Sequence, residues 1–323
     1  YIGDWSSDVC SSDLDNHFEC MWDMFRSVPS IETPNVSVLD EYYWLNKHDP
    51  NYSLCRATIN CGEDAHTDKM FKLDRKSALA LSKLFITPEK NLENKKISDV
   101  LPDSFWETNF WLYWQTMFAF QKWSSALEMK RYLCRYVHHI DGLPDFSALR
   151  FTKYNQYESM ILPLTKYLES NGVKIEYGID VKNVIFESKQ NKKVIKTCTG
   201  KEICEEWLYH IGIPTNEIET YADKCNTTTC YMPYINAFFQ PREEKDRPLV
   251  VPKESINFAF VGQFAETPRD TIFTTEYSIR TGMEAVYTLL KIDRAVPEVW
   301  GSKYDVRELL KACYYAVDKK SVD

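Results

Sequence analysis

Glycine is scarce in this sequence, and one glycine pattern is missing. The 323-residue chain has only 10 glycines, and none of them form the G-x-G-x-x-G turn that cradles a dinucleotide pyrophosphate. The 10 cysteines include no C-x-x-C pair, which argues against the commonest zinc and redox motifs and indicates free thiols in a reducing compartment. No apolar run is long enough to cross a bilayer and no secretory signal is visible, so we expect a cytoplasmic protein.

Charge and aromatic content narrow the class of protein further. The formal net charge is −8 and the isoelectric point is about 5.4. Because an acidic chain repels phosphate backbones, we expect no nucleic-acid partner. Hydrophobic residues make up 44% of the chain and aromatic residues 14%, which is typical of a globular protein with a bulky apolar interior or an apolar pocket.

Apolar residues recur at helical spacing in several segments. Phe18, Met21, Trp22 and Phe25 predict one helix. The aromatic-rich run over residues 103–140 predicts two or three helices, because one helix of that length would be unusual in a globular domain. Further helices are predicted over 75–86, 155–170, 197–212 and 304–317, and short strands over 173–188.

The segment from 257 to 290 has the outline of a nucleotide-binding element. The apolar run 258–261 predicts a buried parallel strand, and Gly262 at its end would let backbone approach a ligand. Thr271, Thr274 and Thr275 precede a predicted helix, and free N–H groups at a helix start suit a pyrophosphate. An ordinary strand, loop and threonine-capped helix remains the alternative.

Two candidate chemical groups lie in the stretch EMKRYLCRYVHHI. Tyr132 lies between Arg131 and Arg135, and nearby cations can lower the pKa of a tyrosine so that it acts as a general acid. A tyrosine packed in an aromatic core is the alternative. The pair His138–His139 predicts no metal site, because adjacent helical residues point in different directions and no carboxylate or thiol lies at ligand spacing.

The aromatic residues of the run 103–140 are too widely distributed for one helix face. They could line a tunnel for an apolar ligand or form part of the core, and the sequence leaves both open. The belt consists of Trp106, Phe110, Trp111, Trp114, Phe118, Phe120 and Trp123.

Several long blocks resemble one enzyme family. The blocks FAFVGQFAETPRDTIFTTEYSIRTGMEAVYTLL, SVLDEYYWLNKHDPNYSLCR, FWLYWQTMFAFQKWSSALEMKRY, HHIDGLPDFSALRFTKYNQYES and CTGKEICEEWLYH are similar, in this order, to the oleate hydratases, FAD-binding enzymes also called myosin-cross-reactive antigens. The resemblance runs from Asp15 to about Ala316. It implies a partial Rossmann-like α/β domain of the two-dinucleotide flavoprotein type, with a large, aromatic-rich helical substrate domain.

The resemblance also implies a reaction and its residues. Family members add water across the cis-9 double bond of oleate or linoleate to give 10-hydroxy fatty acids, and the flavin undergoes no net redox change. A tyrosine, here Tyr132, protonates one alkene carbon, while a glutamate activates water. The implied substrate-pocket residues are Trp114, Phe118 and Arg131. The implied FAD contacts are Gly262, Gln263, Phe264, Thr271, Thr274, Thr275 and Glu276, with Thr271 and Thr275 foremost.

This chain departs from the family pattern in three main places and in one lesser one. The N-terminal strand with its glycine-rich turn is absent. The position of the water-activating glutamate falls on Asp13, which lacks the surrounding glycine-rich loop and is not assigned as the base. Between strand-like residues 194–196 and TCTG, the family has a long block that this chain lacks. In the family that block holds further FAD contacts and a Thr-x-Asn-x-x-x-His segment that anchors the fatty-acid carboxylate. Ser124 replaces an expected histidine.

These features predict five regions. We expect residues 1–14 to be non-native, 15–150 to bind substrate, 151–200 to belong to the FAD-domain sheet, 201–256 to lie on the substrate side, and 257–323 to hold the FAD-binding strand, loop and helix. The resemblance allows a homodimer and peripheral membrane contact. The alternatives are an inactive remnant that binds FAD or fatty acid, and a flavin-dependent oxidoreductase. Because a central strand is missing, we expect aggregation or weak FAD binding.

Overall fold

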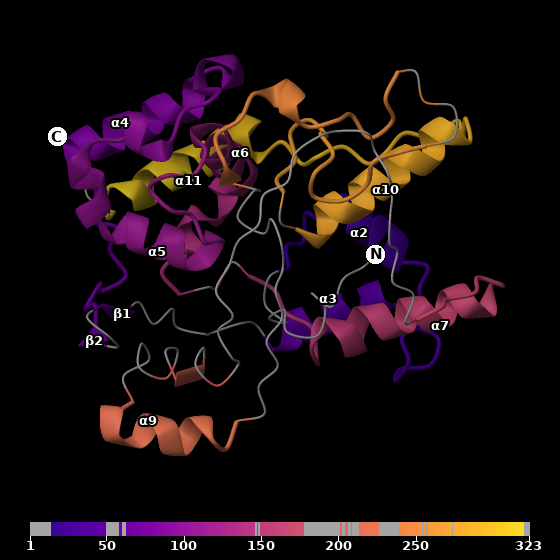
Figure 1. Cartoon of the computed structure of the whole chain (residues 1–323). Helices are drawn as coiled ribbons and strands as arrows, with labels where there is room; N and C mark the ends of the chain where they lie inside the picture. The colour runs from indigo at the N-terminus through magenta and orange to yellow at the C-terminus, as the bar shows by residue number, and fades with distance from the viewer. Residues whose placement is uncertain are drawn as a thin grey trace.

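The computed structural model describes residues 14–49, 58–59, 63–145, 147, 149–177, 201, 204–205, 208, 213–225, 239–253, 255, 258–272 and 274–319. Helices dominate this part of the chain (Figure 1). Its sheet is an antiparallel pair of two-residue strands, β1 Thr58–Ile59 and β2 Glu63–Asp64. Within the described ranges, no helix is both long and apolar enough to cross a membrane.

Several α-helices begin where a polar side chain can satisfy the free N–H groups of the first turn. Ser37 and Asp40 form a capping box at one helix start, and Asp74, Ser125 and Thr274 cap three others. The helix bounds are α2 Glu19–Phe25, α3 Val38–His48, α4 Arg75–Ile86, α5 Asn109–Phe118, α6 Ala126–Tyr136, α7 Leu162–Ser170, α9 Thr215–Ala222, α10 Thr275–Leu289 and α11 Val306–Ala316.

Short helical turns connect these elements. A π-helical turn, η5 Tyr157–Ile161, leads directly into α7. The 3-10 turns are η1 Glu89–Leu92, η2 Ile97–Asp99, η3 Asp103–Glu107, η4 Val137–Gly142, η7 Glu244–Asp246 and η8 Ser302–Tyr304.

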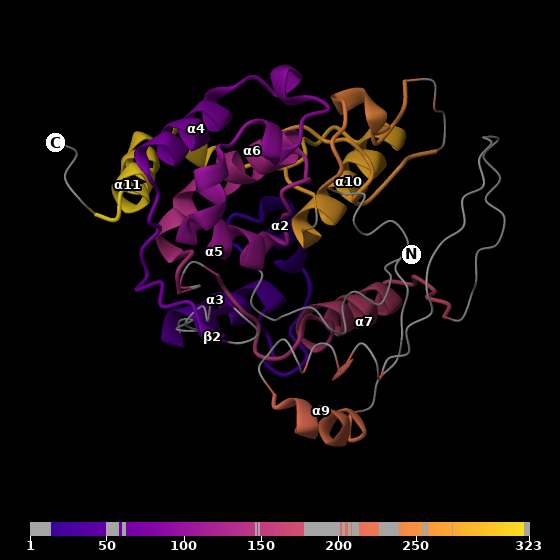
Figure 2. The same cartoon turned by 60° about the vertical axis from the view of Figure 1, so that its left-hand side comes forward.

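Helix α6 is at the centre of the main helical group. It packs against α4, η1, η4 and η8, and α11 packs on η4. On the other side of the group, α10 lies against α2, whereas α9 lies apart from these helices in both views (Figures 1 and 2). Almost every residue of α6 is buried, including four charged ones. A polar helix at the centre of a core needs internal partners for those charges, and these partners build the sites described below.

The helix predictions are confirmed where the structure describes them. The helix over 75–86 has the predicted bounds, and the run 103–140 divides into η3, α5, α6 and η4. The predicted stop at Asn171-Gly172 is also confirmed, since Gly172 has φ 85°. Of the predicted helix 197–212, the described residues 201, 204, 205 and 208 are helical. The predicted strands over 173–188 are not formed by residues 173–177, and the rest lie outside the described residues.

The predicted buried strand over 258–261 is wrong. This segment has no strand structure, and the side chains of Phe258 and Val261 are 44% and 60% exposed. A buried parallel strand needs neighbouring strands on both sides. Here the described residues supply only the segment around Val250, whose carbonyl accepts a 2.8 Å hydrogen bond from the Phe260 N–H.

Exposure of this apolar segment bears on the solution behaviour of the chain. Phe258, Val261 and Phe264 are all more than one third exposed within seven residues. Because exposed apolar side chains in one place favour association, we expect the chain to elute from gel filtration as oligomers or aggregates. Light scattering on the eluate checks this expectation, and a monodisperse monomer with a stoichiometric flavin spectrum would contradict it.

Candidate functional site

Tyr132 is buried in the centre of α6 among aromatic rings. Phe118 and Phe120 present their edges to its ring at centroid distances of 5.2 and 5.0 Å, and the ring of Phe239 lies 6.0 Å away. The Tyr132 hydroxyl donates a hydrogen bond to the carbonyl oxygen of Ile272. The candidate proton donor therefore contacts the segment 257–290, which the sequence predicted to bind a flavin.

The expectation that flanking arginines lower the pKa of Tyr132 is wrong. Burial raises the pKa of Tyr132 well above its usual value, and Tyr136 adds to the rise. Arg131 is engaged instead by Glu266 at 2.6 Å and Glu89 at 2.9 Å. Arg135 binds the Asp270 carboxylate at 3.3 Å. Burial disfavours the charged tyrosinate and carboxylates neutralise both guanidinium groups, so the tyrosine holds its proton more firmly than an exposed tyrosine does.

Most of the aromatic belt is part of the core in the described structure, although Trp123 is exposed. Trp114 is fully buried, with its ring 4.7 Å from Phe118 and stacked at 5.6 Å on Phe110. Phe118 is half-buried and bridges Trp114 to Tyr132. The Trp114 Nε1–H has no hydrogen-bond acceptor among the described residues. The belt therefore packs as core and also places Phe118 against the candidate proton donor.

Three of the predicted flavin contacts lie on an accessible turn. Gly262 has φ 88°, which favours glycine, and a Cβ added there would meet no heavy atom within 4 Å. Gln263 follows it, and its amide nitrogen donates to the Thr274 carbonyl at 3.1 Å. Phe264 is about half exposed. This turn can approach a ligand without displacing protein atoms.

The other predicted flavin contacts have structural partners. Thr271 is fully buried, and Thr274 caps α10, of which Thr275 is the first residue. The Glu276 carboxylate accepts hydrogen bonds from the backbone N–H groups of Cys20 at 3.0 Å and Met21 at 2.8 Å. Glu276 therefore caps the first turn of α2 and fixes it against α10. Burial, together with Asp270, raises the pKa of Glu276.

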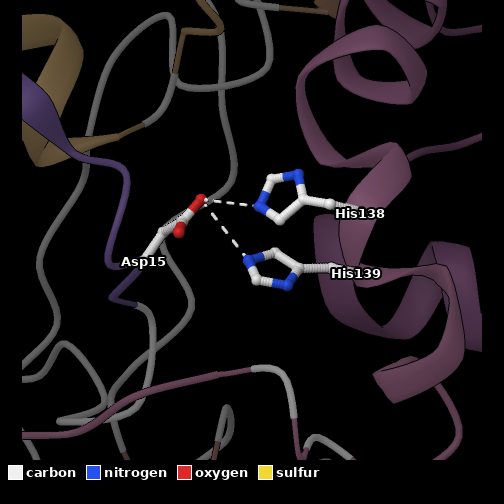
Figure 3. A group of neighbouring side chains, drawn as sticks. All are labelled: Asp15, His138 and His139. Atoms are coloured by element: carbon white, nitrogen blue, oxygen red, sulfur yellow. Dashed lines mark ion pairs between the residues drawn. The ribbon is translucent and has the colours of Figure 1, made fainter. Parts of the chain in front are cut away.

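A cluster that the sequence did not predict lies at η4, the turn that follows α6. The Nε2 atoms of His138 and His139 each lie 3.4 Å from one oxygen of Asp15. Figure 3 shows both imidazole rings directed at the Asp15 carboxylate, which comes from the segment before α2. The argument that adjacent histidines must diverge was therefore wrong in this turn. No sequence spacing signals the cluster, because Asp15 is far from the histidines along the chain.

His138 gives this cluster a pH dependence. Burial lowers the pKa of His138 from the usual 6.5 to about 4. The unfolded chain therefore takes up a proton that the folded protein excludes as the pH falls from 6.5 towards 4, so folding stability decreases over that window. The full effect is roughly 3 kcal/mol. Urea unfolding in a chelating buffer at pH 7, 5 and 4 measures it, and His138→Gln should weaken the dependence. Equal pH dependence in both proteins would contradict this assignment.

The described residues thus define a helix-rich protein with a buried tyrosine hydroxyl among aromatic rings, and an accessible glycine turn elsewhere in the segment 258–290. A model of the MCRA family matches residues 9–197 and 191–287. The chain belongs to the MCRA family.

Two curated relatives support this membership. The chain is 34% identical to the oleate hydratase of Streptococcus pyogenes serotype M49 (strain NZ131) over 476 alignment positions, which cover 96% of this chain and 80% of that protein. It is 30% identical to the linoleate hydratase of Lactiplantibacillus plantarum over 450 positions, which cover 83% of this chain and 79% of that protein.

The comparisons also confirm the predicted internal gap. The 476-position alignment is longer than the 323-residue chain itself, so the relative has residues that this chain lacks. The two family matches meet at residues 191–197, which is where the sequence predicted that a block is missing.

Proposed function

We propose that this chain is a fatty acid hydratase by descent, acting on oleate or linoleate. The observation that supports this proposal is the placement of Tyr132. Its protonated hydroxyl lies in an aromatic setting that suits an alkene, in a chain 34% identical to an oleate hydratase. Hydration gives a 10-hydroxy fatty acid with no net redox change.

In the proposed reaction, Tyr132 transfers its hydroxyl proton to one carbon of the double bond. Water adds to the other carbon and loses a proton to a base, so that H and OH are gained across the bond. Phe118 and Phe120 bracket the tyrosine ring and exclude water from it. The Ile272 carbonyl orients the hydroxyl. The family position of the base, Asp13, lies outside the described residues.

The turn Gly262–Phe264 fits a flavin, because open space surrounds Gly262 and the Phe264 ring is accessible. Glu276 and Thr271 do not fit the same role, since both are fully buried. When bound, FAD would organise the site for hydration without net redox change. The proposal places this turn in a Rossmann-like FAD domain of the two-dinucleotide type. It also includes peripheral membrane contact and a homodimer, as the apolar substrate and the resemblance suggest.

The test is product formation from oleate by the purified 323-residue chain with added FAD. Mass spectrometry in H2(18)O should detect 10-hydroxystearate with one labelled oxygen. If no labelled product forms at any enzyme concentration while oleate still binds, turnover is rejected. That result would favour a protein that binds its ligand without turnover.

The second candidate is a protein that binds FAD or fatty acid without turnover. It is favoured by the missing internal block, because the family's carboxylate anchor belongs to that block and the chain reads directly from 196 into TCTG. Fluorescence titration with oleate separates the two candidates. Binding without product supports the remnant, and binding with product supports the hydratase.

A further inference from the structure

The cluster of Asp15, His138 and His139 has the donor set of a transition-metal site. One carboxylate oxygen and two imidazole nitrogens lie within 4.8 Å of one another. Carboxylate and imidazole ligands suit divalent zinc and its neighbours in the first transition row. The sequence argued against a metal because the histidines were expected to diverge and no carboxylate lay near them in the chain, and the tertiary structure removes both reasons.

The distances fit a metal better than direct hydrogen bonds. Zinc bonds to imidazole nitrogen and carboxylate oxygen are about 2.0–2.1 Å long, so two ligand atoms on a tetrahedron are about 3.3 Å apart. The Asp15 oxygen lies 3.4 Å from each Nε2 atom. A hydrogen bond between such atoms is typically about 2.7–2.9 Å. The Asp15 oxygen and both Nε2 atoms are buried without a hydrogen-bond partner among the described residues.

The surroundings prepare these groups for a cation. The Nδ1 of His138 lies 3.2 Å from the buried Ser302 hydroxyl, which orients the ring and leaves Nε2 to face Asp15. Although burial alone would raise it, the two imidazoles hold the pKa of Asp15 well below its usual range. Burial also keeps His138 neutral at pH 7. The Arg135 guanidinium, 4.0 Å from Asp15, is paired with Asp270 at 3.3 Å.

A cavity gives access to the cluster. It has a volume of about 210 Å³ and is lined by the three cluster residues together with Asn16, His17, Arg150, Trp300, Glu308 and Lys311. Three protein ligands leave one position of a tetrahedral zinc for water, which this cavity can supply.

We propose that Asp15, His138 and His139 bind a divalent transition-metal cation of the zinc class, with water as fourth ligand. The cation joins the segment before α2 to η4, the turn that follows α6. The site is separate from the hydratase chemistry, so its test does not depend on turnover.

Zinc titration of the metal-free 323-residue chain by calorimetry tests the proposal. We expect one saturable site, with affinity reduced about 100-fold or more in Asp15→Asn and His139→Gln, because each variant removes a ligand. At zinc concentrations about 100 times the Kd, Tm should rise by about 5 °C or more in the wild-type chain and not in His139→Gln. His139 is partly exposed, so its variant tests the site even if Asp15→Asn fails to fold.

His66→Gln is the matched control, because this exposed histidine also lies near a carboxylate, 3.8 Å from Asp64. It should leave zinc affinity unchanged. Cobalt substitution should give tetrahedral visible bands without thiolate charge-transfer absorption, which excludes binding by cysteines. Absence of saturable uptake by the wild-type chain, equal affinity in His139→Gln, or thiolate bands with cobalt would each overturn the proposal.

Discussion

Replacing Tyr132 by phenylalanine should lower the rate of oleate hydration by about 100- to 10,000-fold, the usual contribution of a positioned general acid. The substitution removes the proton that the alkene must receive and keeps the ring that packs against Phe118 and Phe120. Product formation measured by mass spectrometry under single-turnover and steady-state conditions checks this. Fatty acid binding should change little, because the lost atom is a single hydroxyl oxygen.

Stability provides the control for this variant. Loss of the hydrogen bond to Ile272 should cost about 1 kcal/mol. Tyr42→Phe removes another buried hydroxyl, which donates to the Asn16 side chain at 2.9 Å, away from the candidate site. The two variants should therefore unfold at similar urea concentrations but differ greatly in activity. Equal activities would remove Tyr132 from the proposed acid role.

Replacing Glu128 by glutamine should destabilise the protein by about 3–5 kcal/mol, the cost of leaving buried charges without their partner. Glu128 lies on α6 and is fully buried. Its carboxylate contacts Arg242 at 2.8 Å and Arg247 at 3.3 Å. Urea unfolding followed by tryptophan fluorescence measures the change in free energy of unfolding.

The size of this effect comes from a buried network rather than from one pair. Glu266 accepts a hydrogen bond from Arg131 at 2.6 Å and forms an ion pair with Arg242 at 2.9 Å, so its charge and that of Glu128 are shared among three arginines. Glu298→Ala is the matched control, because its contact with Arg269 is on the surface. It should leave stability unchanged within error, since exposed ion pairs contribute little. A small effect of Glu128→Gln would mean that water or another group compensates the arginines.

Local signals explain which parts of the fold could be predicted. The α4 helix over 75–86 was predicted with its correct ends, because Asp74 caps its start and Pro88 follows its end. The strand over 258–261 was predicted wrongly, because an apolar run forms a buried strand only where neighbouring segments cover it. In the described residues Phe258 and Val261 remain exposed.

The candidate site shows the same division between local and long-range information. The surrounding motif predicted Tyr132 as the candidate acid. It did not predict the direction in which the pKa of Tyr132 is shifted. Arg131 and Arg135 lie beside Tyr132 in sequence, but their guanidinium groups pair with the carboxylates of Glu266 and Asp270. Similarly, nothing near Glu276 in the chain predicts that it caps α2, because the helix start that it contacts is more than 250 residues away.

The sequence by itself determined the helices and the family and singled out Tyr132 as the candidate acid, because capping, helical periodicity and motifs all act within a few residues. Tertiary structure alone decided that the pKa of Tyr132 is raised rather than lowered, and it alone grouped Asp15 with His138 and His139. It did so because burial raises or lowers a pKa only through the groups packed around it, and those groups come from segments far apart in the chain.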